Sequence, residues 1–198
     1  MLADFRREMG SEAIFDIRVE QTERLLSGLK AGFYDIVFCS YQPGETGVVF
    51  TPVVELPFVV AMRRDDPLAQ YKELTPGQLR DRPMVFTDSP AYSDLLNRML
   101  GEYGVRPEVK GFSNEDSVLL SMVQAGMGIF ISTDHPQMYS PDTILVPLRQ
   151  DRYRRYVYMV TREGMAASAA AGQLIRFNQR RAVSERGRQP RADGGQNE

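Results

Sequence analysis

The sequence predicts an α/β protein built from two similar units, because one pattern occurs twice along the chain. Residues 25–40 read LLSGLKAGFYDIVFCS, and residues 119–133 read LLSMVQAGMGIFIST. In each stretch an apolar helical stripe ends at an Ala-Gly pair and is followed by a short apolar strand. Glycine suits the position after a helix because the backbone there often takes a positive φ, so Gly32 and Gly126 mark the helix ends. The strands end in small polar residues, which is typical of a sheet covered on both faces. Helix–glycine–strand segments are common in α/β proteins, so the two stretches can resemble each other by chance. The predicted α/β class is the same in either case.

The composition is that of an ordinary globular protein and excludes several function classes. The 198 residues can bury one large core or two small ones, and the net charge of −2 gives no electrostatic reason to expect a nucleic-acid surface. A single cysteine, Cys39, excludes an intrachain disulfide and fits a reducing compartment. No apolar run is long enough to span a bilayer, and residues 1–10 lack the apolar core of a secretory signal. We therefore expect a cytoplasmic protein without a membrane partner.

The first part of the chain reads as two helices, with a strand between them and three strands after them. Residues 1–9 predict a helix that has no N-cap and begins in mid-pattern, so we expect a strand and half a helix to be missing upstream. Residues 14–20 (IFDIRVE) alternate between apolar and polar and predict a strand. Thr22 suits the N-cap of the next helix, whose leucines form a buried stripe. Strands are then expected at residues 35–40, 48–54 and 57–63.

The second part again alternates strands and helices. Asp88-Ser89-Pro90 predicts the start of a helix that stops at Gly104, and residues 113–116 have the form of a capping box that opens the next helix. Further strands are expected at residues 84–87, 108–112, 128–133, 144–148 and 152–162, and an alanine-rich helix at residues 166–181. From residue 182 the sequence is too polar, and too interrupted by glycine and proline, to bury an apolar face.

These elements predict two lobes joined by two crossings. The sequence becomes polar and turn-rich after Arg63, so the first lobe is expected to comprise residues 1–63. Residues 64–150 then form the second lobe, residues 151–181 return to the first, and residues 182–198 form a disordered tail.

The residues that carry most enzyme chemistry are scarce. The single histidine, His135, precludes a multi-histidine metal site, and its polar loop predicts a surface position. No Gly-x-Ser-x-Gly turn presents a serine, and neither a dinucleotide fingerprint nor a phosphate loop is present. Cys39 lies near the end of an apolar strand, which favours a core position over a reactive one. The sequence thus predicts no catalytic residue, no metal and no cofactor.

Small polar residues follow predicted strands or open predicted helices, at the kind of sheet edge where open α/β proteins bind ligands. They are Thr22 and Ser40 in the first lobe, and Thr87, Ser89, Ser113 and Asn114 in the second. Helix N-termini at such an edge supply free backbone N–H groups and a positive dipole end, which favours a small anion such as a carboxylate. Thr22, Ser89 and Ser113 also fit as ordinary helix caps, and the carboxylate of Asp88 opposes an anion unless it faces away or pairs with an arginine.

The order of several loose motifs resembles the effector-binding domain of LysR-type transcriptional regulators. These motifs are L-L-x-x-L-x-x-G-x-x-D-I at residues 25–36, V-V-x-x-x-x-x-D-P-L-A at residues 59–69 and V-x-x-G-x-G-I at residues 123–129. The resemblance covers roughly residues 1–180. It departs from the family at Asp66, where histidine is common, and in the absence of a helix-turn-helix segment and of the first strand of lobe I.

The resemblance implies a two-lobed fold like that of type 2 periplasmic binding proteins, each lobe a wound sheet flanked by helices, with an effector bound between the lobes. It implies ligand contacts at Thr22, at residues 87–89 and near Phe130. It also implies DNA binding only through a helix-turn-helix segment absent from this chain, and a homo-oligomer for the full-length regulator. On this basis the chain is expected to be a fragment that senses a small, anionic metabolite.

Three other hypotheses stay open on the sequence alone. A solute-binding protein for transport shares the fold, an enzyme could use carboxylates such as Asp35 or Asp88, and a lobe edge that lacks a strand could pair with another chain.

Overall fold

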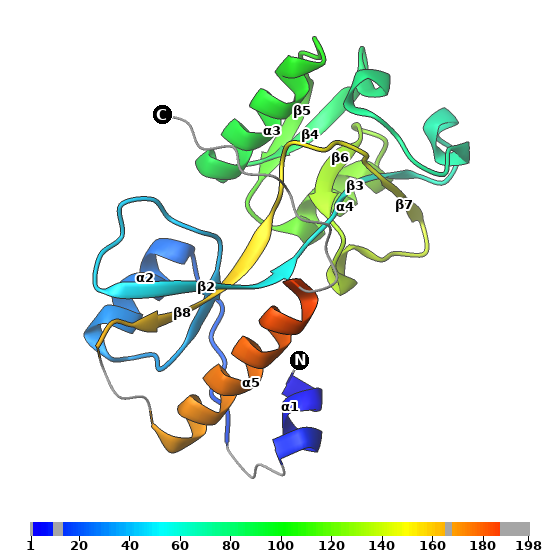
Figure 1. Ribbon diagram of the computed structural model, residues 1–198. Helices are drawn as coiled ribbons and strands as arrows, with labels where there is room; N and C mark the ends of the chain where they lie inside the picture. The colour runs from blue at the N-terminus through cyan, green and yellow to red at the C-terminus, as the bar shows by residue number, and fades with distance from the viewer. Residues whose placement is uncertain (1, 10–13, 165–167, 187–198) are drawn as a thin grey trace. The chain divides into compact units, whose positions relative to one another are not determined.

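The computed structural model describes residues 2–9, 14–164 and 168–186 (Figure 1). Contacts divide the chain into two compact units, Met1–Glu55 with Tyr156–Glu198, and Leu56–Arg155. The boundaries expected from the sequence, after residues 63 and 150, differ from this division. The reason is strand pairing: β3 (Phe58–Arg63) pairs with strands of the second unit, and β8 (Tyr156–Arg162) pairs with strands of the first.

The first unit is a three-stranded antiparallel sheet with helices packed on it. Its strands run in the order β1-β8-β2, where β1 is Val37–Cys39 and β2 is Val48–Glu55. α2 (Thr22–Ala31) buries Leu26 and Leu29 against this sheet, and Cys39 lies in the same cluster. Burial raises the pKa of the Cys39 thiol to about 11, so the thiol stays protonated at neutral pH and packs as a core side chain. The core position predicted for Cys39 is confirmed.

Two further helices of the first unit contact each other. α1 (Leu2–Met9) buries Phe5 against Phe177 of α5 (Ala169–Arg186). The two rings meet edge to face, with centroids 5.5 Å apart. α5 runs to residue 186, so the first five residues of the predicted tail are helical, while residues 187–198 and the predicted helix start at residues 166–167 lie outside the described residues.

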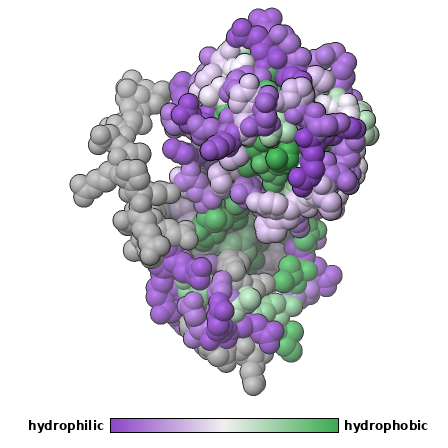
Figure 2. Space-filling model, turned by 90° about the vertical axis from the view of Figure 1, so that its right-hand side faces the viewer, coloured by the Kyte–Doolittle hydropathy of each residue, from purple (hydrophilic) through white to green (hydrophobic). Residues whose placement is uncertain are grey.

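The strand predicted for residues 14–20 is wrong. These residues are described without regular structure, and Ile14, Ile17 and Val19 are 98%, 65% and 93% exposed. An alternating sequence forms a strand only beside a hydrogen-bonding partner, and within the described residues β1 pairs with β8 alone. Figure 2 shows apolar green atoms among the polar surface in the lower part of the view. Apolar side chains of this segment are thus exposed to solvent, and the alternation in the sequence did not indicate this.

The second unit is a mixed sheet with helices on both faces. An antiparallel part has the order β6-β3-β7, and a parallel pair joins β4 (Pro83–Thr87) to β5 (Glu108–Ser113). A parallel bridge between Met84 and Ile129 connects the pair to β6 (Phe130–Thr133). The full order is therefore β5-β4-β6-β3-β7, with β7 at Thr143–Pro147.

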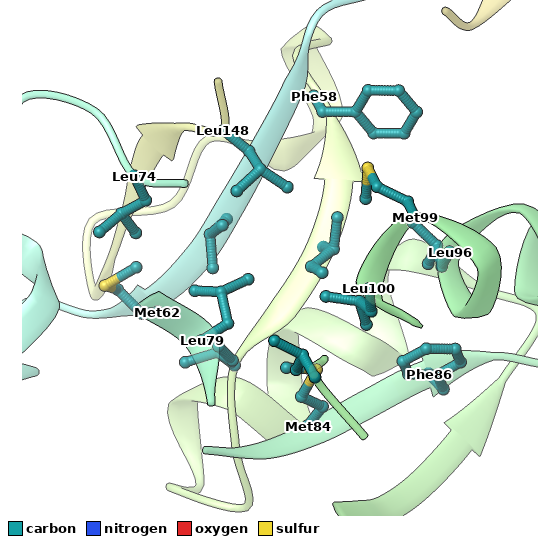
Figure 3. Packing of buried hydrophobic residues seen from close by; sticks show 14 of the residues in the cluster. Phe58, Met62, Leu74, Leu79, Met84, Phe86, Leu96, Met99, Leu100 and Leu148 are labelled. Atoms are coloured by element: carbon teal, nitrogen blue, oxygen red, sulfur yellow. The ribbon is translucent and has the colours of Figure 1, made fainter. Parts of the chain in front are cut away.

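Apolar clusters cover the two faces of this sheet. Figure 3 shows the larger one, in which Met62 and Phe86 of the strands pack with Leu96 and Leu100 of α3 (Pro90–Glu102). The smaller cluster joins the sheet to α4 (Asp116–Gln124). Short 3-10 turns at Pro67–Gln70, Pro76–Leu79 and Pro136–Met138 complete the unit. At the first of these, Asp66 accepts a hydrogen bond from the Leu68 amide and pairs with Arg82.

Helix ends agree with the sequence better than helix starts do. Gly32 and Gly126 have φ of 83° and 76°, which confirms the two glycine stops. Ser89 is the N-cap of α3 with Pro90 at N1, as predicted. Thr22 is not an N-cap, because α2 begins at Thr22 with Gln21 before it. The capping box predicted at residues 113–116 is also wrong, because Glu115 occupies the N-cap of α4 without a side-chain cap bond.

Candidate functional site

One edge of the second sheet gathers the ends of three parallel strands. Thr87 pairs with Ser113 in the β4–β5 register, and the Asp88 amide donates to the Ser113 carbonyl over 3.0 Å. β6 is parallel to β4 through the Met84–Ile129 bridge, so Thr133 ends at the same edge. α3 and α4 start directly after β4 and β5, which directs their N-termini toward this edge. The structure therefore brings together the small polar residues predicted in the second lobe, Thr87, Ser89, Ser113 and Asn114.

Local hydrogen bonds stiffen the turns at this edge. The buried Thr87 hydroxyl accepts the Ser89 amide over 3.2 Å, and the Ser93 hydroxyl donates to the Thr87 carbonyl over 2.6 Å. The Ser113 hydroxyl accepts the Glu115 amide over 3.1 Å. The Thr87 and Ser113 hydroxyls act as acceptors in these bonds, so their O–H hydrogens are left over for a ligand, whereas the Ser93 hydrogen is already used.

Ser89 and Asn114 expose their side chains at the same edge. Within the described residues neither side chain takes part in a hydrogen bond of the protein, and the Ser89 hydroxyl does not cap α3. The Asp88 side chain is exposed as well. The edge thus offers free polar groups together with the Asp88 carboxylate, which opposes an anion.

Thr22 and Ser40 belong to the first unit. Thr22 is the first residue of α2, and Ser40 follows the last residue of β1; both are half-buried. The chain reverses at Gly32 between helix and strand, so these two residues lie toward the same end of the α2–β1 pair.

The edge of the second sheet at which Thr87, Ser113 and Thr133 end is called the polar edge below. Phe130 does not lie at this polar edge. Its side chain is fully buried and packs with Ala61, Val85 and Leu119 beneath α4. The resemblance placed a ligand contact near this residue, but the aromatic ring is part of the core, since residues of β6 are buried from both faces of the sheet.

An aromatic stack at the edge was not found from the sequence. Tyr92, in the first turn of α3, stacks on Phe58 of β3, with ring centroids 6.5 Å apart and planes 15° from parallel. The guanidinium carbon of Arg155 lies 4.1 Å from the centroid of the Tyr92 ring. Burial chiefly raises the pKa of the Tyr92 hydroxyl, with Asp116 adding to this and Arg155 opposing it. Among the described residues this buried hydroxyl has no hydrogen-bond partner.

The sequence predicted a surface position for His135, but the structure places it partly inside the protein. It is half-buried, and its Nε2 lies 3.0 Å from Oδ2 of Asp116 in the first turn of α4. Phe58 pairs with Thr133 in the β3–β6 register, two residues before His135. The histidine and the aromatic stack therefore occupy neighbouring parts of one edge. In the part of the chain that the structure describes, no group of three or more histidine, cysteine, aspartate or glutamate side chains is placed to hold a metal ion.

Comparison with known proteins adds the family. A model described as the LysR substrate binding domain matches residues 1–182. The chain belongs to this family. The confirmed family carries with it the two-lobed, periplasmic-binding-protein-like α/β fold expected from the sequence.

Curated relatives of this LysR domain are transcriptional regulators. The chain is 34% identical over 108 residues to the HTH-type transcriptional regulator XapR of Escherichia coli K12, covering 53% of this chain and 36% of XapR. It is 25% identical over 150 residues to a RuBisCO operon transcriptional regulator of Acidithiobacillus ferrooxidans, covering 74% and 48%. The LysR domain therefore spans between a third and a half of the length of these regulators.

Solved structures share the fold of this LysR domain at low identity. The effector-binding domain of QuiR in complex with shikimate has a TM-score of 0.80 at 20% identity, over 92% of this chain and 88% of that one. The BenM effector-binding domain with benzoate has a TM-score of 0.77 at 18% identity, over 100% and 90%. Full-length CbnR with its target DNA has a TM-score of 0.80 at 16% identity, over 91% and 62%.

Proposed function

We propose that this LysR domain senses a small anionic metabolite, which binds at the polar edge of the second unit. The observation that carries the proposal is the convergence of three parallel strand ends with two helix N-termini, where unpaired side-chain and hydroxyl donors are available. Such an edge suits a carboxylate because free N–H groups and the positive helix dipole ends favour negative charge. The solved relatives named with shikimate and with benzoate support this ligand class.

Sensing requires that the metabolite bind two conformations of the protein with different affinity. In a full regulator this difference would change DNA contacts made through a helix-turn-helix segment outside this chain, in a homo-oligomer in the cytoplasm without a membrane partner. The regulators among the relatives support this role. No reaction on the metabolite is proposed, and the family match gives no support to a transport protein. Contacts from Thr22 and Ser40 to the same metabolite stay a prediction.

The test is a thermal-shift panel of carboxylate metabolites that begins with shikimate and benzoate, followed by calorimetric titration of any compound that raises Tm. Ser89→Ala is expected to weaken binding about 10- to 150-fold, because a hydrogen bond to a charged ligand contributes about 1.5–3 kcal/mol. Its own fold should be little affected, since the Ser89 side chain makes no cap bond.

Ser121→Ala is the matched control. The Ser121 hydroxyl bonds back to the Ser117 carbonyl in the middle of α4 and is exposed, so binding should stay unchanged. Equal affinity of the Ser89→Ala variant and the unmodified protein would remove Ser89 from the site, and a panel in which no anion raises Tm would contradict the proposed function.

A further inference from the structure

We infer that Arg155, whose guanidinium carbon lies 4.1 Å from the centroid of the Tyr92 ring, is the group that binds a carboxylate of the effector; this inference rests on the proposed function. Tyr92 and its neighbour Phe58 act as positioning residues that hold the guanidinium in place.

Among the described residues the Arg155 side chain contacts the Tyr92 ring and makes no hydrogen bond or ion pair of its own. A guanidinium is attracted to an aromatic ring by its charge, and its five N–H groups lie in its own plane. Those in-plane N–H groups form the fork that matches the two oxygens of a carboxylate. The Tyr92 ring is itself buried and stacked on Phe58, so it is a rigid platform. A half-buried Arg155 held in this way loses less conformational entropy when it binds an anion.

Five other cations of the second unit are already paired with carboxylates. Such pairs are Arg63–Asp65, Arg82–Asp66, Lys110–Glu108, Arg149–Glu73 and Arg152–Glu102. Arg155 contacts an aromatic face instead, and among the described residues of the unit no carboxylate pairs with it. A cation held in place without an internal counter-ion is available for an external one.

Arg155 also lies beside the strand ends. The backbone carbonyl of Arg155 accepts a hydrogen bond from the Leu56 amide over 2.8 Å. Leu56 lies two residues before Phe58, and Phe58 pairs with Thr133 at the edge. Tyr92 is three residues after Ser89 on α3. Asp116 carries a negative charge that acts on the Tyr92 hydroxyl, and its Oδ2 lies 3.0 Å from Nε2 of His135.

The experiment follows the Nε–Hε signal of Arg155 by NMR in the full chain, with the signal assigned by its loss in Arg155→Lys. Sodium benzoate is the probe, benzamide is its neutral match, and inorganic phosphate tests the anion class. Benzoate is expected to shift the Arg155 signal, whereas benzamide and phosphate should leave it in place. Arg155→Lys keeps the charge but lacks the planar fork, and should weaken benzoate binding about tenfold.

Two variants separate positioning from a structural effect. Tyr92→Phe keeps the aromatic face and should bind benzoate as the unmodified protein does, whereas Tyr92→Leu removes the face and should weaken binding about three- to tenfold. Circular dichroism checks that all variants are folded. Full benzoate affinity in Arg155→Lys, an unmoved Arg155 signal, or a phosphate shift that matches the benzoate shift would each overturn the inference. If Arg155→Lys binds benzoate with full affinity, only the role of Arg155 is refuted. If no anion of the thermal-shift panel raises Tm, the proposed function itself is refuted.

Discussion

Gly128→Ala is expected to destabilise the second unit by at least about 3 kcal/mol, the upper end of the usual cost of overpacking. A β-carbon at this position would lie 2.5 Å from the Pro83 carbonyl oxygen and 2.9 Å from the Met84 amide nitrogen. Both are backbone atoms of β4, so no side chain can swing away to make room. The two hydrogen bonds that join β4 to Ile129, each 2.9 Å long, would have to lengthen or break.

Gly101→Ala is the matched control for this prediction. Gly101 lies in α3 with open space around its Cα, so alanine should be neutral or stabilise the helix by up to about 1 kcal/mol. Urea unfolding followed by circular dichroism at 222 nm measures both variants. Equal stability of Gly128→Ala and the unmodified protein would show that β4 and β6 are not in direct contact at this bridge.

Phe5→Ala is expected to cost about 3–5 kcal/mol in the first unit, as for other buried phenylalanines cut back to alanine. The Phe5 ring is fully buried and makes edge-to-face contacts with Phe177 at 5.5 Å and with Phe15 at 6.0 Å. Its removal leaves a cavity between α1 and α5, since the backbone can collapse only partly. Hydrogen exchange read by mass spectrometry should show α1 and α5 losing protection, while β3 and β4 keep theirs.

Phe33→Ala makes the same chemical change at an exposed position. The Phe33 side chain is 83% exposed, so its loss should alter stability by no more than about 0.5 kcal/mol. A Phe5→Ala variant as stable as Phe33→Ala would mean that α1 does not pack on α5.

Much of the fold could be predicted from the sequence, because its strongest signals are local. The positive φ at Gly32 and Gly126 follows from the chemistry of helix ends, and Pro90 at N1 fixes the start of α3. The strand at residues 14–20 failed because alternation shows which face would be buried but supplies no neighbouring strand.

The candidate site was only partly predictable for the same reason. Thr87 and Ser113 could be placed at one edge because parallel strands that lead into helices end together. The stack of Phe58, Tyr92 and Arg155 joins three segments far apart in the chain, and no spacing in the sequence relates them. The burial of the Phe130 ring could not be foreseen, because a motif locates the backbone of a strand but does not tell which side chains face the core.

A crystal structure of the chain with a carboxylate that raises its Tm tests the central claim most directly. The carboxylate oxygens are expected within about 2.7–3.2 Å of donors at the polar edge of the second unit, with the Arg155 guanidinium and the Ser89 hydroxyl among them. The first unit has an open hollow elsewhere, lined in part by Arg24, Phe33 and Tyr34. A carboxylate bound only in that hollow, with the polar edge unoccupied, would contradict the claim.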